Sequence, residues 1–306
     1  MISPSTNPAK QLRRPLDPPP MSQNPQIPLE KEANMTESPF MIVPFSKLVK
    51  IPLIVLFLTG FLNERAHGND EEWIQLFNGK NLSGWQVKIR GEKLGNNYGN
   101  TFRVEEGLLT VGYEAYGDFN EKFGHLFYHQ PFSHYHLRAE YRFIKEQSKG
   151  GPGWAIRNSG FMLHGQDPAT MSLDQDFPVS IEAQLLGGLG KGDRTTANVC
   201  TPGTHIVMDG RLIKNHCVQS SSQTYHGEQW VSVEAIVKGS ESIELRVEGE
   251  TVFKLKDPQL DPSDPNAKGL IKDNELLIRS GTISVQSESH PIQFRKIELK
   301  RLDPTE

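Results

Sequence analysis

After Asn69, the chain is dominated by short runs in which apolar and polar residues alternate, and helical periodicity is almost absent. In residues 135–143, the apolar side chains fall on odd positions and the polar or charged ones on even positions. A period of two is the pattern of a β-strand with one buried face and one polar face. Further runs of this kind cover residues 158–164, 180–186, 231–237, 243–247, 283–286 and 292–299.

Clusters of Gly, Pro, Asn and Asp separate these runs, so the pattern predicts an all-β fold of two antiparallel sheets packed face to face. The polar outer face of one sheet is then free to hold a ligand. Several loops are longer and richer in glycine than strand connection requires, which predicts that they wall a site. These loops are residues 88–100, 145–153, 165–178, 187–198 and 257–274.

The start of the chain has a different composition. Residues 1–40 contain nine of the twenty-one prolines and almost no apolar periodicity. Such a segment buries too little apolar surface to offset its ordering entropy, so we expect a disordered extension there. Because export signals normally begin a chain, we expect translation to start at Met35 or Met41.

Residues 41–68 have the features of a secretion signal. The apolar run within them is too short to span a bilayer, which needs about 20 residues. We therefore expect cleavage near Asn69, export to the periplasm or the extracellular space, and one mature domain over residues 69–306 without an integral membrane segment. An uncleaved membrane anchor is the alternative. The features are a positive pair, an apolar run and small residues before the cleavage point: Lys47 and Lys50, residues 51–62, and Ala66-His67-Gly68.

Net charge and cysteine content narrow the classes of partner. The formal net charge of −4 provides no basic face for nucleic acid. The two cysteines, Cys200 and Cys217, cannot form a structural zinc site alone. Export permits a disulfide, and we expect these residues to form one. A reactive thiol is the alternative, and it requires a partner base.

Polar side chains that can carry chemistry concentrate in two predicted strands. If the strands are neighbours, a carboxylate, an imidazole and two amides converge, a set suited to general acid–base chemistry and to holding sugar hydroxyl groups. A solvated polar face is the alternative interpretation. The residues are Asn158 and His164 on the first strand, and Glu182 and Gln184 on the second.

Other features indicate a site more weakly. His134 and His136 have the spacing of a metal-binding pair, but the sequence places no third ligand, so we expect no metal and no other cofactor. Trp85 and Trp154 could stack on sugar rings or lie in a core. No Gly-x-Ser-x-Gly motif of a serine hydrolase is present, and the glycine-rich residues 187–192 lack the Walker pattern, which favours a flexible loop.

Four motifs follow one another along the mature chain. They are the opening FNGKNLSGW at 77–85, NSGF at 158–161, IEAQL at 181–185, and the closing strands GTISVQS and IQFRKI at 281–287 and 292–297. In this order they resemble the 3-keto-disaccharide hydrolase domain family over nearly all of residues 73–302. The resemblance implies a concanavalin A-like lectin/glucanase jelly roll. The segment from Cys200 to Cys217 and the loop at 166–176 are similar to one branch of the family, so the substrate is expected to differ from that of its best-known members.

The resemblance also implies an activity, the cleavage of glycosides already oxidised to a ketone at sugar carbon 3. An upstream sugar 3-dehydrogenase is then expected in the same pathway. The ketone acidifies the proton on carbon 2, a base removes that proton, the glycosidic oxygen leaves carbon 1, and water adds to the enone.

The faces of the strands and the needs of this chemistry suggest roles for individual residues. We expect Glu182 to be the base and His164 the acid or a second base, with Arg157 or Asn158 stabilising the oxyanion. The other residues expected to bind the carbohydrate substrate are Gln184, Gln166, Asp176 and Trp154.

Two rival interpretations come from other classes of protein. A non-catalytic lectin-like module would keep the sheet and the stacking aromatic residues without a titratable Glu182. A laminarinase-type hydrolase needs Glu-x-Asp-x-(x)-Glu on one strand, whereas Glu182 is followed here by Gln184 and Leu186. Release of sugar from a 3-keto glycoside would distinguish an enzyme from a binding module.

The signal predicts the mass of the mature protein. We expect the exported form to begin near Asn69, because the small residues before it match a cleavage site. Mass measurement of the exported protein tests this expectation, and retention of residues 1–40 would contradict it.

Overall fold

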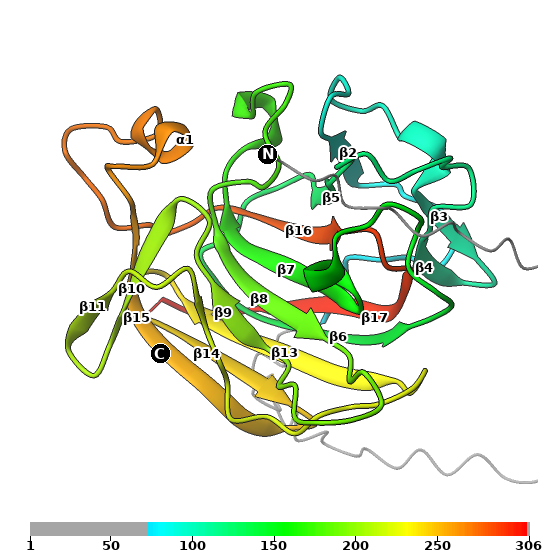
Figure 1. Ribbon diagram of the computed structural model, residues 1–306. Helices are drawn as coiled ribbons and strands as arrows, with labels where there is room; N and C mark the ends of the chain where they lie inside the picture. Colours follow the sequence, from blue (N-terminus) through cyan, green and yellow to red (C-terminus); the bar gives the residue numbers. More distant parts are fainter. Residues whose placement is uncertain (1–72, 305–306) are drawn as a thin grey trace, which may run out of the picture. The chain divides into compact units, whose positions relative to one another are not determined.

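The computed structural model describes residues 73–304, and two antiparallel β-sheets make up most of this segment (Figure 1). The larger sheet has ten strands in the order β11-β10-β15-β14-β13-β6-β17-β4-β3, with β1 paired to β17. Its strands are β1 (Ile74–Gln75), β3 (Phe102–Glu105), β4 (Leu108–Val111), β6 (His134–Phe143), β10 (Thr204–Met208), β11 (Arg211–Ile213), β13 (Val231–Lys238), β14 (Ser242–Val247), β15 (Glu250–Leu260) and β17 (Ile292–Arg301).

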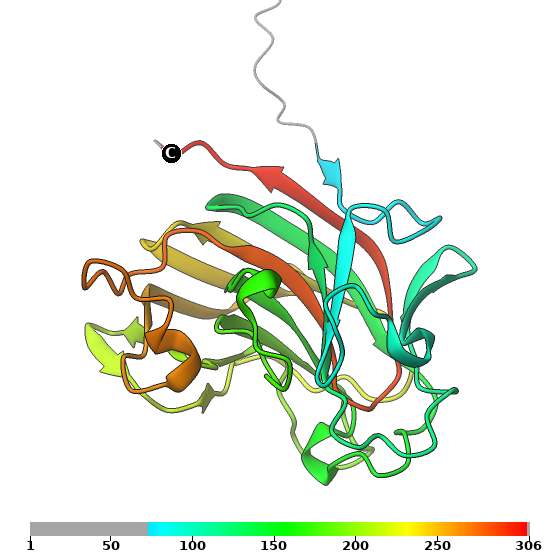
Figure 2. The ribbon, with the colours of Figure 1, turned by 90° about the horizontal axis from the view of Figure 1, so that it is seen from above.

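The smaller sheet has seven strands in the order β12-β9-β8-β7-β16-β5-β2. These strands are β2 (Trp85–Ile89), β5 (Gly124–Tyr128), β7 (Asn158–Gly165), β8 (Ile181–Leu186), β9 (Asn198–Cys200), β12 (Cys217–Val218) and β16 (Thr282–Ser287). The helices are the short 3-10 turns η1 (Tyr98–Asn100), η2 (Gly153–Ala155) and η3 (Pro168–Thr170), and α1 (Pro265–Lys268) at the margin of the sandwich (Figure 2). The predicted all-β sandwich of two antiparallel sheets is confirmed.

The apolar faces of the two sheets form one core. In β6, the odd-numbered residues from Tyr135 to Phe143 are buried, as the alternation predicts. Phe161 of β7 meets Phe294 of β17 edge to face, with ring centroids 5.5 Å apart, and so connects the sheets. Because successive residues of a strand point to opposite faces, this core determines which side chains of β7 and β8 point outward.

The outward face of the ten-stranded sheet carries ion pairs between neighbouring strands. His136 of β6 contacts Glu234 of β13 at 2.5 Å, and Arg138 of β6 pairs with Glu298 of β17. The ring of His134 instead contacts a neighbouring serine hydroxyl. In the described part of the chain, no group of three or more His, Cys, Asp or Glu side chains could hold a metal ion.

The predicted extension at residues 1–40 and the predicted signal at 41–68 lie outside the described residues. The cleavage near Asn69 and the export that follows from it therefore stay predictions. Among the residues that are described, no helix is long and apolar enough to cross a membrane.

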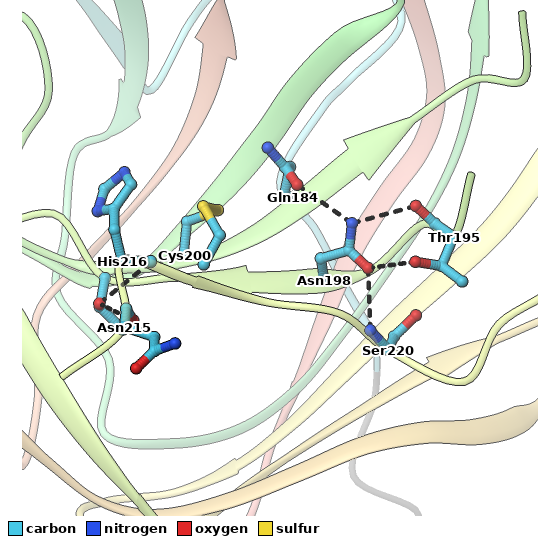
Figure 3. The surroundings of a disulfide bond; sticks show 9 residues. Gln184, Thr195, Asn198, Cys200, Asn215, His216 and Ser220 are labelled. Atoms are coloured by element: carbon cyan, nitrogen blue, oxygen red, sulfur yellow. Dashed lines mark hydrogen bonds between the residues drawn. A yellow bond between two sulfur atoms is a disulfide. The ribbon is translucent and has the colours of Figure 1, made fainter. Parts of the chain in front are cut away.

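The predicted disulfide between Cys200 of β9 and Cys217 of β12 is confirmed (Figure 3). The two residues lie opposite each other at one edge of the seven-stranded sheet. Because β12 has only two residues, few hydrogen bonds attach it to the sheet, and the disulfide fastens it to β9.

The disulfide is expected to stabilise the fold measurably. Its two cysteines are 17 residues apart, and a loop of this length corresponds to about 3 kcal/mol in the chain-entropy estimate. We expect the double variant Cys200→Ser/Cys217→Ser to lose about this much free energy of unfolding in urea denaturation. Reduction of the unmodified protein serves as the control and should give a similar loss. Two free thiols in the unfolded exported protein would contradict the pairing.

Candidate active site

A cavity of about 380 Å³ opens on the outward face of the seven-stranded sheet. The disulfide forms part of its wall, next to His216 (Figure 3). Of the loops predicted to wall a site, those at 165–178 and 187–198 contribute lining residues, and Trp154 directly follows the loop at 145–153. The loops at 88–100 and 257–274 contribute none. The loop predicted at 88–100 begins later than expected, because β2 runs to Ile89. The loop predicted at 257–274 also begins later, because β15 runs to Leu260. The lining residues are Trp154, Asn158, Phe177, Glu182, Gln184, Leu186, Arg194, Cys200, Pro202, His216, Cys217 and Glu288.

The alternation of β8 places Glu182 in this cavity. Ile181 and Ala183 point into the core, so Glu182 between them points outward. Gly160 of β7 provides the space for its side chain. A Cβ atom at Gly160 would lie only 2.6 Å from Oε1 of Glu182. The carboxylate therefore lies over the neighbouring strand, where a side chain larger than hydrogen would collide with it.

Glu288, which directly follows Ser287 at the end of β16, shares the cavity with Glu182. The two side chains are buried, with exposed fractions of 3% and 6%, and each has a carboxylate oxygen without a hydrogen-bond partner among the described residues. Burial raises the pKa of Glu182 to about 8. Burial, and then the charge of Glu182, raises the pKa of Glu288 well above its usual range. Because two interacting buried carboxyl groups resist ionising together, the pair retains a proton at neutral pH.

Further buried polar groups lie on the same face of the sheet. Gln286 of β16 lies opposite His125 of β5, which lies opposite Lys88 of β2. Neither the His125 ring nitrogens nor the Gln286 amide has a hydrogen-bond partner within residues 73–304. Burial, and then the charge of Lys88, lowers the pKa of His125 to about 3, so its imidazole is neutral at neutral pH. Phe177 meets this ring edge-on, with centroids 6.0 Å apart.

Aromatic side chains border the cavity. Trp154 is 55% exposed, and its ring is stacked on that of Phe123 with centroids 5.8 Å apart and an interplanar angle of 19°. Phe177 lies against the other ring of this pair, with its centroid 5.2 Å from that of Phe123. An exposed indole supported in this way offers a flat apolar surface to a ring-shaped ligand.

Two predicted binding residues lie in the cavity with Glu182 and Trp154. Asn158 is buried, and its Oδ1 has no hydrogen-bond partner in the described segment. Oε1 of Gln184 accepts a hydrogen bond of 3.2 Å from Nδ2 of Asn198 on β9 (Figure 3). Its amide nitrogen remains available to a ligand because this bond uses only the oxygen.

The structure does not bring His164 to Glu182. The φ angle of His164 is +51°, and the pairing of β7 with β16 shifts register next to it. This irregularity breaks the alternation and turns the ring toward the core, where it meets Tyr135 edge-on at 6.2 Å. Nε2 of His164 donates a hydrogen bond of 2.9 Å to the carbonyl oxygen of Gly239. The expected convergence of the imidazole and the carboxylate is therefore absent.

Three other predicted site residues lie outside the cavity wall. Gln166 stabilises its own loop, because its Oε1 accepts hydrogen bonds from the Gln175 side chain and the Val179 backbone. Asp176 forms an ion pair of 3.0 Å with Arg90.

Arg157, the third of them, has a φ angle of +48° and directs Nη1 to the carbonyl oxygen of Gly227, 2.6 Å away. Asn158 is thus the one of the two predicted oxyanion-binding residues that lines the cavity.

Sequence reasoning did not identify Glu288 or Arg194. Glu288 continues the outward phase of Ser284 and Gln286, so extending the alternation past the end of β16 could have found it. Arg194 belongs to the loop between β8 and β9, where no periodicity indicates the direction of a side chain.

Comparison with known proteins gives one family and several distant structures. The family model of the 3-keto-alpha-glucoside-1,2-lyase-like domain matches residues 72–300. No curated protein matches the chain. A candidate glycosyl hydrolase from Parabacteroides distasonis has 17% identity and a TM-score of 0.46, and the match covers 76% of this chain and 95% of that chain. For the β-glucanase of Bacillus licheniformis, the identity is 12%, the TM-score 0.40, and the coverage 76% and 98%.

The close approach of Gly160 and Glu182 predicts an energetic coupling. We expect Gly160→Ala to lower the free energy of unfolding by about 1–3 kcal/mol, because the added methyl group overpacks the site. The same substitution should cost less in a Glu182→Ala background, where the colliding atoms are gone. Urea denaturation of the four proteins measures the coupling, and Gly153→Ala is the matched control because a Cβ atom there meets nothing within 4 Å. Equal costs in both backgrounds would disprove the steric argument.

Proposed function

Because the chain belongs to the 3-keto-alpha-glucoside-1,2-lyase-like domain family, whose members act on carbohydrate, we propose that it cleaves glycosides whose sugar carries a ketone at carbon 3. The observation that carries this proposal is the pair of buried carboxyl groups, Glu182 and Glu288, in one cavity bordered by an exposed tryptophan. The pair can accept one proton and donate another at the same place.

The proposed reaction is an elimination followed by hydration. The ketone at carbon 3 acidifies the proton on carbon 2, and a base takes that proton. The resulting enediolate expels the glycosidic oxygen from carbon 1, and this oxygen takes up a proton as it leaves. Water then adds across the enone, so that the overall change is hydrolysis of the glycosidic bond. An ordinary glycoside lacks the ketone, and its carbon 2 proton is not acidic enough to start this sequence.

The ionisation of the two carboxyl groups supports their assignment to the two proton transfers. A general base works best when its pKa lies near the working pH, and the pKa of Glu182 is raised to about 8. We assign ionised Glu182 as the base and protonated Glu288 as the acid that protonates the leaving oxygen. This assignment replaces His164 as the acid, because the imidazole of His164 points into the core. Activity should rise with pH as Glu182 ionises and fall when Glu288 also loses its proton.

Uncharged side chains of the cavity wall can stabilise the developing oxyanion and bind the sugar. Negative charge develops on the ketone oxygen as the carbon 2 proton leaves, and the amide of Asn158 can donate to it from the cavity wall. The amide nitrogen of Gln184 can hold a hydroxyl group, and the exposed face of Trp154 can pack against the sugar ring. No step in this scheme requires a metal or a cofactor.

A lectin-like module is the second candidate, and the exposed Trp154 favours it. The buried carboxyl pair argues against it. A buried carboxyl group without hydrogen-bond partners destabilises the fold, and a module that only binds sugar has no use for two of them. Turnover of a 3-keto glycoside decides between the two candidates.

A glycosidase with two carboxylates has weaker support. The laminarinase-type enzymes of this class carry Glu-x-Asp-x-(x)-Glu on one strand. In β8, Glu182 is followed by Gln184 and Leu186, so this strand lacks the second and third carboxylates.

We also propose that the protein acts outside the cytoplasm. The disulfide supports this proposal, because such bonds persist in oxidising compartments. The substrate must reach the protein already oxidised at carbon 3, so a sugar 3-dehydrogenase should act before it.

Removal of the base tests the proposed function. Glu182→Gln keeps the size of the side chain and should leave folding intact, while turnover of a 3-keto glycoside falls by a factor on the order of 100 or more. Turnover number and thermal unfolding are measured together for both proteins. Glu250→Gln is the matched control, because Glu250 is exposed on the ten-stranded sheet, and it should keep full turnover.

The same assay can refute the mechanism in separate ways. Full activity of Glu182→Gln would disprove the assignment of the base. Cleavage of plain glycosides at a similar rate would disprove the elimination. In heavy water, deuterium should appear at carbon 2 of the released sugar, and its absence would contradict proton removal from that carbon.

A further inference from the structure

A positively charged corner forms another part of the wall of the cavity that holds the carboxyl pair. Arg194 lines the cavity and is half-buried. Its Nη1 donates hydrogen bonds to the carbonyl oxygens of Gly187, at 2.7 Å, and of Arg157, at 3.2 Å. Within residues 73–304, no carboxylate forms an ion pair with Arg194 or with Arg157. A half-buried guanidinium usually has an anionic partner, so the missing partner is a feature to explain.

The surroundings of Arg194 add positive charge instead of neutralising it. Burial, and then the charge of Arg157, lowers the pKa of Arg194. The guanidinium of Arg157 is itself bonded to a backbone carbonyl, that of Gly227. Among the lining residues, the only acidic ones are Glu182 and Glu288, and burial favours the neutral form of both. The corner therefore keeps a net positive charge.

His290 lies near this corner but is not among the residues that line the cavity, and its ring meets Phe143 edge-on with centroids 5.6 Å apart. The side chain is 2% exposed, and neither of its ring nitrogens has a hydrogen-bond partner in the described residues. It lies close enough to Arg157 and Arg194 for their charges, after burial, to lower its pKa to about 4. The ring is therefore neutral and adds no positive charge to that of the two guanidinium groups.

We propose that Arg194 anchors an anion subsite, so that the natural substrate is a 3-keto glycoside bearing a carboxylate or sulfate group. This inference rests on the proposed function. A guanidinium binds both oxyanions through paired, charge-assisted hydrogen bonds, and the cavity supplies no protein group to take their place. A glycoside without a charged group would leave the buried charge of Arg194 uncompensated.

The register of the sheet limits where the anion can lie on the substrate. The carboxylate of Glu182 lies over Gly160 of β7. Arg194 donates a hydrogen bond to the carbonyl oxygen of Gly187. Gly187 directly follows Leu186, the residue of β8 that pairs with Asn158 of β7. Residues 158 and 160 are two residues apart, or about 7 Å along an extended strand. The charged group therefore lies away from the reacting carbons 1 to 3. We place it on carbon 6 of the oxidised sugar or on the group to which the sugar is linked, because a group on carbon 4 would lie next to the reacting carbon 3.

Three synthetic substrates test the subsite. They are phenyl 3-keto-glucoside, its analogue with a carboxylate at carbon 6, and 4-carboxyphenyl 3-keto-glucoside. We expect kcat/KM of the unmodified protein to be at least about tenfold higher for one acidic substrate than for the neutral one, since a charge-assisted hydrogen bond contributes this much or more. The substrate that benefits shows whether the anion belongs on the sugar or on the linked group.

Substitution of Arg194 connects this preference to the residue. Arg194→Gln should reduce kcat/KM for the preferred acidic substrate at least about tenfold more than for the neutral one. Arg194→Lys keeps a charge and should retain part of the preference. Arg211→Gln, a matched change at an exposed arginine of β11, should leave all three values unchanged. Equal losses for the three substrates with Arg194→Gln would show that Arg194 only holds its loop, and would overturn the inference.

The outcomes also separate this inference from the proposed function. Cleavage of all three substrates without a preference overturns the subsite and leaves the function standing. If no substrate is cleaved, the proposed function fails, and calorimetry with phenyl glucoside, phenyl glucuronide and 4-carboxyphenyl glucoside decides the subsite alone. Tighter binding of one acidic glycoside than of phenyl glucoside, lost in Arg194→Gln, supports the subsite, and any other calorimetric result overturns it.

Discussion

The packing of the two sheets against each other is the interaction on which the candidate site depends. The contact between Phe161 and Phe294 is part of a core that uses one face of every long strand. With that face occupied, the residues in between must point outward. In β8, this constraint leaves Glu182 and Gln184 no other direction, so the position of the carboxylate follows from the position of its apolar neighbours.

The fold and the direction of Glu182 could be predicted because period-two alternation is a local property of the sequence. The position of His164 could not, since one residue with a positive φ angle reverses the phase, and alternation gives no sign of it. Glu288 lies just beyond its strand and Arg194 lies in a loop, where the direction of a side chain depends on contacts with distant segments. The disulfide was predictable because two cysteines offer one pairing only.

The cavity concentrates groups that weaken the fold. Glu182, Glu288 and Asn158 are buried in its wall with unpartnered polar atoms, each of which costs free energy that the apolar core must offset. These residues surround one place on one sheet face, whereas the outward face of the other sheet pairs its charges across strands. Local instability of this kind is common where a protein binds or transforms a ligand, because the ligand supplies the missing partners.

The disulfide between β9 and β12 has a consequence for the maturation of the cavity. A two-residue edge strand frays easily, and here that strand also forms part of the wall next to Glu182. The wall is therefore complete only after the two thiols have been oxidised, a step that oxidising compartments favour. Shape complementarity to a sugar would then arise in two stages, first by folding of the sandwich and later by a covalent bond. The redox state of the surroundings would then control whether the cavity can bind its sugar.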